Sequence, residues 1–264
     1  MTHSGPIGMF DSGMGGLSVL HEVRLLLPHE DVLYFADSAH CPYGSQTEAF
    51  VRRRVLHIAD FQLEQGAKVL VVACNTASIA ALDALRARYP EVPIVGMEPA
   101  VKPAVAATRN RRIGVLATTV TLHGDRFSSL LQRYARDVEV ITLPGTGLVE
   151  RVEAGQLDTP ETLAWLRTLL APFLQAGVDT LVLGSTHYPF LRAAIREVLG
   201  PQVTLIDTGA AVARRVQQVL EENGLATPTA LPGQETFTTS GDPAVLTPVL
   251  RRLWGRPAAL GHHD

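Results

Sequence analysis

Two stretches of this sequence share one pattern: Val69-Leu-Val-Val-Ala-Cys74-Asn75-Thr76 and, further along, Thr180-Leu-Val-Leu-Gly-Ser185-Thr186-His187. Each is a short apolar run that ends in a small nucleophilic side chain followed by two polar residues. Other strand-like runs recur at nearly the same spacing, Ile7–Asp11 with Ile113–Ala117 and Pro93–Glu98 with Gln202–Asp207. The repetition predicts two similar halves that form the two walls of one cleft, each offering a thiol or a hydroxyl to the ligand.

Short apolar runs alternate with helical patterns along the whole chain, which is typical of an α/β fold with parallel sheets. The expected strands are rich in Val, Ile and Leu and do not alternate with polar residues, as in strands buried on both faces. They are residues 6–10, 31–36, 69–73, 93–97, 113–117, 138–143, 180–184 and 203–206. Because the pattern is duplicated, we expect two pseudo-symmetric, doubly wound domains, with a single (β/α)8 barrel as the alternative.

Start and stop signals delimit the helices between these runs. Helices are expected after Thr47, after Thr159-Pro160 and after Asp242-Pro243, and the glycines Gly66 and Gly177 stand where two of them should end. A further helix is expected over residues 210–223, which would return the chain to the first domain. We therefore expect a discontinuous first domain, 1–97 with 207–264, and a second domain, 98–206.

The composition argues against several classes of protein. The chain has 264 residues, of which 46% are hydrophobic and 19% charged, and its net charge of −3 gives no electrostatic reason to expect nucleic acid. No run approaches the roughly 20 apolar residues that span a bilayer, and Met1-Thr-His-Ser does not begin a secretion signal. We expect a cytoplasmic protein with reduced thiols at Cys41 and Cys74.

The histidines show no paired spacing typical of a metal site, so no metal is expected. His262 and His263 are expected to lie in a disordered tail. Neither Lys68 nor Lys102 has the sequence context of a Schiff-base lysine, so no pyridoxal phosphate is expected either.

Polar residues follow the predicted strands where ligands bind in open α/β sheets. Asp11-Ser-Gly-Met-Gly-Gly16 links a strand to a helix whose N-terminus can bind an anion. Cys74 lies at a similar junction, where the helical N–H groups should lower its thiol pKa from about 8.5. The alternatives are a tight turn capped by Asp11, a buried structural cysteine and, at Ser185, a Ser/His hydrolase that lacks the usual elbow motif.

At Asp11-Ser-Gly-Met-Gly-Gly16, Pro42-Tyr-Gly-Ser45, Ala73-Cys-Asn-Thr-Ala77 and Gly184-Ser-Thr-His-Tyr-Pro189 the sequence resembles the glutamate racemases of the cofactor-independent amino-acid racemase superfamily. The four motifs occur in the family's order, and the resemblance covers roughly residues 5–255. It implies two α/β domains with the active site between them, a homodimer, and a role in supplying D-glutamate for peptidoglycan.

The resemblance also implies the site residues. Those implied to bind substrate are Asp11, Ser12, Tyr43, Gly44, Asn75, Thr76, Thr186 and His187. Those implied to act in catalysis are Cys74, Asp11, His187, Glu150 and the residue at position 185, with Glu153 a weaker candidate than Glu150.

Racemisation removes a proton from one face of the α-carbon and returns one to the other face. A cysteine on each wall suits this because its pKa lies near the working pH. The family has its second catalytic cysteine where this chain has Ser185, and a serine hydroxyl is a far weaker acid. We hypothesise an engineered Cys-to-Ser substitution, with a natural serine as the alternative, and we expect glutamate binding with little or no racemisation.

Other functions also fit the sequence. An aspartate or hydantoin racemase is one, although Pro42-Tyr-Gly-Ser45 favours glutamate. An arylmalonate decarboxylase also works with one cysteine, but that cysteine lies in the second half of the chain. A naturally inactive binding protein with the racemase fold is the non-enzymatic alternative.

Overall fold

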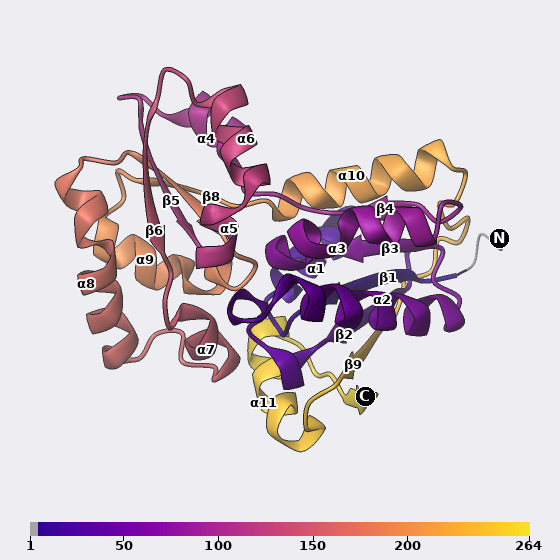
Figure 1. The fold of residues 1–264 in the computed structure, drawn as a ribbon. Helices are drawn as coiled ribbons and strands as arrows, with labels where there is room; N and C mark the ends of the chain where they lie inside the picture. The colour runs from indigo at the N-terminus through magenta and orange to yellow at the C-terminus, as the bar shows by residue number, and fades with distance from the viewer. Residues whose placement is uncertain (1–4) are drawn as a thin grey trace. The chain divides into compact units, whose positions relative to one another are not determined.

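The computed structural model describes residues 5–264, which form two compact units, each built on its own sheet (Figure 1). Within the described residues, the first unit runs to Met97 and resumes over Gly209–Asp264, and the second unit is Glu98–Thr208. Met1-Thr-His-Ser4, on which the expectation about a secretion signal rests, lies outside the described part of the chain.

The first unit contains a six-stranded sheet with the order β10-β9-β2-β1-β3-β4, and its paired strands run parallel. Its strands are β1 (Ile7–Asp11), β2 (Val32–Ala36), β3 (Val69–Val72), β4 (Ile94–Val95), β9 (Glu235–Thr239) and β10 (Leu260–His262). Its helices are α1 (Leu17–Leu26), α2 (Glu48–Glu64), α3 (Asn75–Arg88), α10 (Gly209–Glu222) and α11 (Pro243–Trp254), with short 3₁₀ turns η1 (Ser38–His40) and η2 (Tyr43–Ser45). Helix α1 packs against α10 and α2 packs against α3. The crossover from β1 to β2 runs in one direction across the sheet, and the crossovers from β2 to β3 and from β3 to β4 run in the other. Because these crossovers are right-handed, the two helix pairs cover opposite faces of the sheet.

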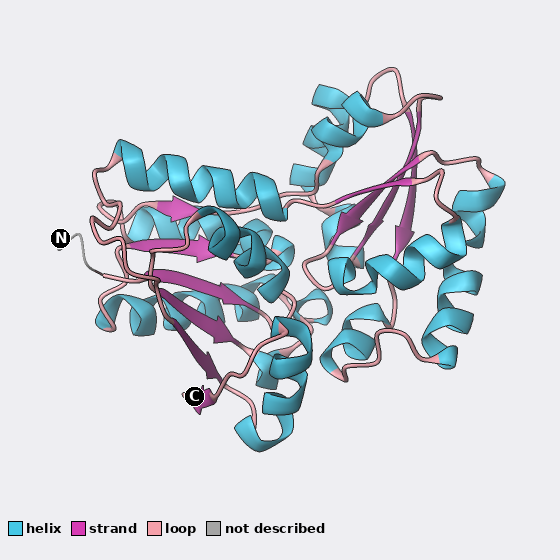
Figure 2. Ribbon diagram, turned by 180° about the vertical axis from the view of Figure 1, so that it is seen from behind, coloured by secondary structure: helices cyan, strands magenta, loops and turns pink. Residues whose placement is uncertain are grey.

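The second unit contains a four-stranded parallel sheet with the order β6-β5-β7-β8 (Figure 2). Its strands are β5 (Arg112–Ala117), β6 (Glu139–Pro144), β7 (Thr180–Gly184) and β8 (Thr204–Ile206). Its helices are α4 (Val101–Ala107), α5 (Thr119–His123), α6 (Asp125–Tyr134), α7 (Leu148–Glu153), α8 (Pro160–Gln175) and α9 (Arg192–Leu199), with a 3₁₀ turn η3 (Tyr188–Leu191).

The two sheets have equivalent topology, because β2-β1-β3-β4 and β6-β5-β7-β8 follow the same order. The repeated stretches of the sequence occupy equivalent places: β1 corresponds to β5, β3 to β7 and β4 to β8. The expected α/β fold with two parallel sheets is confirmed. The barrel alternative is wrong, since the strands of the described chain form two open sheets instead of one closed one.

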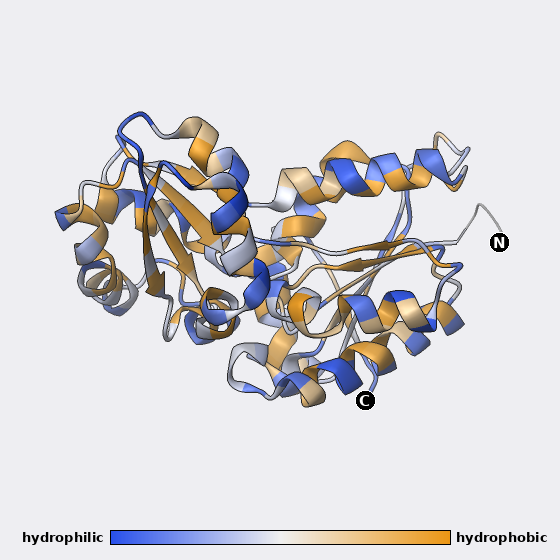
Figure 3. Cartoon of the chain, turned by 45° about the horizontal axis from the view of Figure 1, so that its top comes forward, coloured by the Kyte–Doolittle hydropathy of each residue, from blue (hydrophilic) through white to orange (hydrophobic). Residues whose placement is uncertain are grey.

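The central strands are apolar because helices cover both faces of each sheet. Every residue of β1, β2, β3 and β7 is buried, and the strands stand out as hydrophobic in Figure 3. In the first unit, Phe10, Phe35 and Val72 form one core cluster with residues of α2 and α3. This packing fixes the carboxyl ends of the strands, where the expected site residues lie.

The predicted helix boundaries are confirmed by their caps. Thr47 and Thr159 each accept a hydrogen bond from the backbone N–H three residues on, and Asp242 accepts one from Ala244. Gly66 and Gly177 have φ of 83° and 65°, the left-handed conformation that ends a helix.

The prediction of a disordered tail at His262 and His263 is wrong. His262 is the last residue of β10, which pairs with β9, and the His263 N–H donates to the Thr239 carbonyl at 2.9 Å. The His263 ring stacks on Phe61, with the ring centroids 4.0 Å apart. The sequence did not indicate β9 and β10, because one alternates Thr with other residues and the other has only three residues.

Candidate active site

Asp11 ends β1 and organises the turn into α1. Its carboxylate accepts hydrogen bonds from the Ser12 N–H at 2.7 Å and the Gly16 N–H at 2.6 Å. A Cβ at Gly16 would lie 2.8 Å from the Cβ of Asp11 and 2.7 Å from the Tyr34 hydroxyl, so only glycine fits this turn. Asp11 thus holds the tight turn that was the alternative from sequence, but the N-cap residue of α1 is Gly16, which has no side-chain cap. The Asp11 side chain is fully buried.

Cys74 follows β3 and is the N-cap residue of α3. Its sulfur accepts a hydrogen bond from the Ala77 N–H at 3.5 Å, and the residue is 5% exposed. Burial raises the thiol pKa well above its ordinary 9.0, and the Asp11 carboxylate raises the pKa further. The N–H groups of Ala77 and Ser12 lower the pKa by less. The expectation of a lowered pKa is therefore wrong, because desolvation of the thiolate outweighs the helix N-terminus.

Three polar side chains surround this thiol, and all are buried. Ser12, Asn75 and Thr76 are 4%, 4% and 5% exposed. The Asn75 Oδ1 atom is buried and has no hydrogen-bond partner within residues 5–264. Leaving a buried amide oxygen without a donor costs free energy. This atom is therefore placed to accept a hydrogen bond from a donor on a ligand.

Tyr43 and Gly44 lie in η2, which packs against α3. Tyr43 is 1% exposed and belongs to the same core cluster as Cys74, and the charge of a Cys74 thiolate would raise the pKa of Tyr43. The Tyr43 hydroxyl donates to Asp37 Oδ2 at 2.5 Å. No acceptor for the backbone N–H groups of Tyr43 and Gly44 is present in the described chain. The predicted residues Asp11, Ser12, Cys74, Asn75, Thr76, Tyr43 and Gly44 form what we call the first half-site.

Ser185 follows β7 at the place equivalent to Cys74. Its Oγ accepts from the His187 N–H at 3.4 Å, and Ser185, Thr186 and His187 are 7%, 4% and 2% exposed. The Thr186 hydroxyl lies 3.4 Å from His187 Nδ1. We call Ser185, Thr186, His187 and the acidic partner of His187 the second half-site.

The acidic partner of His187 is Glu153. His187 Nε2 lies 2.7 Å from Glu153 Oε1, and the two side chains are 3% and 16% exposed. Glu150, the preferred candidate from sequence, lies one turn earlier on α7 and is exposed. Burial, and secondarily the Glu150 charge, raises the pKa of the Tyr188 hydroxyl. The geometry thus favours Glu153, the weaker candidate, as the carboxylate that orients His187.

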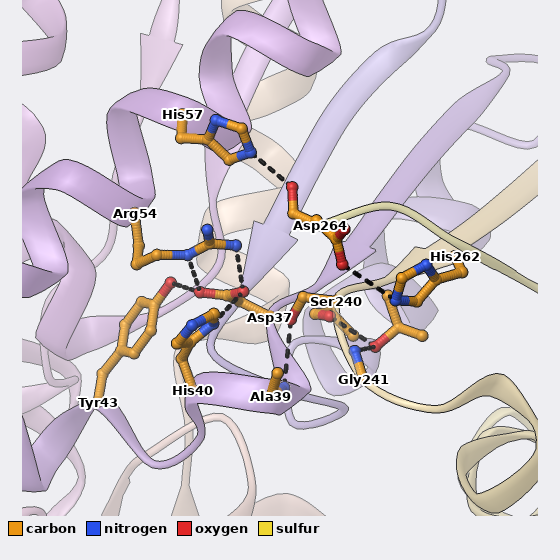
Figure 4. A network of polar contacts seen from close by, with 12 residues as sticks. Asp37, Ala39, His40, Tyr43, Arg54, His57, Ser240, Gly241, His262 and Asp264 are labelled. Atoms are coloured by element: carbon orange, nitrogen blue, oxygen red, sulfur yellow. Dashed lines mark hydrogen bonds and ion pairs between the residues drawn. The ribbon is translucent and has the colours of Figure 1, made fainter.

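Asp37 stands among the polar residues that follow strands, but neither Asp37 nor Arg54 was assigned a role from the sequence. Asp37 follows β2, and its fully buried carboxylate is bound by Tyr43, by His40 and by two N–H groups of Arg54 (Figure 4). Burial alone would raise the pKa of Asp37, but hydrogen bonds led by that of Arg54 hold it below its ordinary 3.8. The available signal was the position of Asp37 directly after a strand. Nothing in the sequence paired it with Arg54.

Within residues 5–264, no helix is both long enough and apolar enough to cross a membrane.

Two parallel sheets of equivalent order, with Cys74 and Ser185 at equivalent strand ends, define a duplicated α/β protein with a thiol in one half and a hydroxyl at the equivalent place in the other. The model of the Asp/Glu/hydantoin racemase family matches residues 18–216. A glutamate racemase of Pseudomonas aeruginosa is 54% identical over 258 residues, 98% of this chain and 97% of that protein. The chain belongs to the glutamate racemase family.

Solved structures agree with this assignment. A glutamate racemase of Bacillus anthracis, 30% identical, superposes with a TM-score of 0.89 over 100% of this chain and 98% of that one. A glutamate racemase of Escherichia coli, in complex with L-glutamate and the activator UDP-MurNAc-Ala, is 35% identical. Its TM-score is 0.85 over 98% of each chain.

Proposed function

We propose that this chain binds glutamate and that its fold serves the cofactor-independent interconversion of L- and D-glutamate. The observation that carries the proposal is the equivalence of Cys74 after β3 and Ser185 after β7, with Asp11 beside Cys74 and the His187 N–H donating to Ser185. Relatives named as glutamate racemases, one of them bound to L-glutamate, support the choice of substrate.

The proposed mechanism needs two acid/base groups, one for each face of the glutamate α-carbon. One group removes the α-proton while the other supplies a proton to the far face, and their roles exchange in the reverse direction. The partnerless Asn75 Oδ1 accepts a hydrogen bond from the substrate ammonium group. The N–H groups of Tyr43 and Gly44 bind a carboxylate, and buried donors stabilise the charge that develops beside the α-carbon.

The raised pKa of Cys74 fits a thiol that stays protonated until substrate arrives. A substrate ammonium group beside Asp11 would offset the carboxylate charge that raises this pKa. Binding would thereby favour the thiolate at the moment when a base is needed.

Ser185 makes this chain a weak or inactive racemase in our proposal. A positioned acid or base contributes about 10²–10⁴ in rate, and a serine hydroxyl ionises too weakly to replace a thiol. Racemisation needs both groups in either direction, so the rates of both directions should fall, whereas glutamate binding should persist. Exchange of the α-proton by Cys74 alone should then survive for one enantiomer. Whether Ser185 is engineered or natural does not alter this chemistry.

The test is proton NMR in D2O, in which the α-proton signals of D- and L-glutamate are followed separately. The parent chain should exchange at most one enantiomer, and the Ser185→Cys variant should racemise both. Ser185→Ala is the matched control, because it removes the hydroxyl without adding a thiol. Similar exchange of both enantiomers by the parent would overturn the two-base assignment.

If neither the parent nor Ser185→Cys changes glutamate, the substrate assignment falls. The same assay with aspartate then tests the other-substrate alternative, and calorimetry with glutamate tests a binding protein without activity. We further propose that the two compact units are the two expected domains. As the resemblance implies, the protein is expected to act as a cytoplasmic homodimer that supplies D-glutamate for peptidoglycan, without pyridoxal phosphate.

A further inference from the structure

Arg54 lies in the middle of α2 and binds Asp37 with two N–H groups. Its Nε lies 3.1 Å from Asp37 Oδ2 and its Nη2 lies 2.8 Å from Asp37 Oδ1, so the guanidinium binds both oxygens of one carboxylate. Asp37 is fully buried, and the Arg54 side chain is 17% exposed. Such a two-point contact fixes the orientation of the carboxylate as well as its charge.

The carboxylate that Arg54 holds is in turn the acceptor for the Tyr43 hydroxyl. The Tyr43 hydroxyl has one hydrogen, which it donates to Asp37 Oδ2, and the two oxygen atoms are 2.5 Å apart. Burial and the charge of Asp37 raise the pKa of Tyr43 well above its ordinary 10.0, so the hydroxyl keeps this hydrogen. The chain of contacts therefore runs from Arg54 through Asp37 to a ring that is 1% exposed.

The Tyr43 ring anchors the turn that carries two partnerless backbone N–H groups. A 3₁₀ turn of three residues has little hydrogen bonding of its own to fix its orientation. The buried Tyr43 ring and its hydrogen bond to Asp37 therefore contribute to setting where the N–H groups of Tyr43 and Gly44 point.

Surrounding residues hold this anchor in place (Figure 4). The Ala39 N–H donates to Ser240 Oγ at 3.2 Å, which ties η1 to the end of β9. One turn beyond Arg54 on α2, His57 Nε2 lies 2.6 Å from the Asp264 carbonyl oxygen. Arg54 and His57 thus both tie α2 to residues outside that helix.

We propose that Arg54 is a positioning residue, which acts through Asp37 and the Tyr43 hydroxyl to hold the Tyr43–Gly44 backbone ready for a substrate carboxylate. This inference rests on the proposed function, because it presupposes that the Tyr43–Gly44 backbone binds a substrate carboxylate. Arg54 itself lies outside the first half-site. Without the guanidinium, Asp37 would be a buried carboxylate with fewer donors. It would tend to take up a proton and cease to be a fixed acceptor for Tyr43.

The test is a double-mutant cycle that measures the Kd for D-glutamate by calorimetry in the full chain. Arg54→Gln should weaken binding about tenfold, because a charge-assisted two-point contact is lost. Tyr43→Phe, which keeps the backbone N–H groups, should weaken binding by a similar factor. Arg54→Gln added to Tyr43→Phe should weaken it by less than about twofold more, since the connecting hydrogen bond is already gone.

Arg53→Gln is the matched control, because Arg53 is exposed on the same helix and its guanidinium lies over the Phe50 ring. It should bind D-glutamate like the parent. Arg54→Lys keeps the charge but loses the two-point contact with Asp37, so its affinity for D-glutamate should lie between those of the parent and Arg54→Gln. This variant replaces Arg54→Gln in the test if Arg54→Gln does not fold. In the Ser185→Cys background the same changes should raise KM more than they lower kcat.

The outcomes separate this inference from the proposed function. If the parent does not bind D-glutamate, the proposed function itself fails. If the parent binds, the inference is overturned when the folded Arg54 variants bind equally well. It is also overturned when the losses from Arg54→Gln and Tyr43→Phe simply add, because an independent structural role would produce that result.

Discussion

The pairing of His187 with Glu153 predicts that two glutamates on one short helix differ sharply in importance. His187 Nε2 and Glu153 Oε1 are 2.7 Å apart, with side chains 3% and 16% exposed, whereas Glu150 is exposed. A hydrogen bond to a charged group contributes about 1.5–3 kcal/mol. Since each 1.36 kcal/mol is tenfold, Glu153→Ala should lower kcat/KM about 13- to 160-fold.

Glu153→Gln should cost less, because the neutral amide keeps a hydrogen bond of roughly half that strength. The expected loss is about 0.75–1.5 kcal/mol, or about 4- to 13-fold in kcat/KM. Glu150→Gln is the matched control and should stay within about twofold of its parent. The assay follows racemisation in both directions by circular dichroism, with every change made in the Ser185→Cys background. The reasoning would be refuted if Glu150→Gln slowed racemisation more than Glu153→Gln.

Two further predictions concern stability. Lys68→Met should lower the free energy of unfolding by about 3–5 kcal/mol in urea titrations, because it leaves buried Glu30, 2.6 Å from Lys68 Nζ, without its charge partner; adding Glu30→Gln should restore much of the loss. Because the folded state raises the pKa of Cys74 above 9.0, it holds this proton more tightly than the unfolded state, so stability should fall as pH rises above about 9. Cys74→Ala should flatten this slope between about pH 9 and 10, and an unchanged slope would contradict the raised pKa.

The fold could be predicted from sequence because its strongest signal is local. Strands buried on both faces read as continuous apolar runs, and the helices carry caps such as Thr47 and stops such as Gly66. Duplication of these runs then indicated two sheets. Strands β9 and β10 were not predicted from the sequence. Strand β9 is rich in Thr and pairs with β2, far away in sequence, and β10 has only three residues and pairs with β9.

The sequence could predict those residues of the candidate site that lie at the ends of strands. Asp11, Cys74 and Ser185 are examples, and each lies where its strand ends. The contacts of Arg54 with Asp37 and of Glu153 with His187 join residues from different elements, so no spacing in the sequence reveals them. The pKa of Cys74 was mispredicted for a related reason. Desolvation depends on how completely the packed fold covers the sulfur, and sequence position reports only the helix terminus.

The two half-sites stand on equivalent strands but differ in their surroundings, so the duplication does not make the two acid/base positions alike. Cys74 caps a long helix beside the Asp11 carboxylate, and a carboxylate favours the protonated thiol. Ser185 precedes a 3₁₀ turn, and its Oγ accepts a hydrogen bond from the backbone N–H of His187. A backbone N–H donor favours an adjacent thiolate. A cysteine introduced at position 185 should therefore ionise more readily than Cys74.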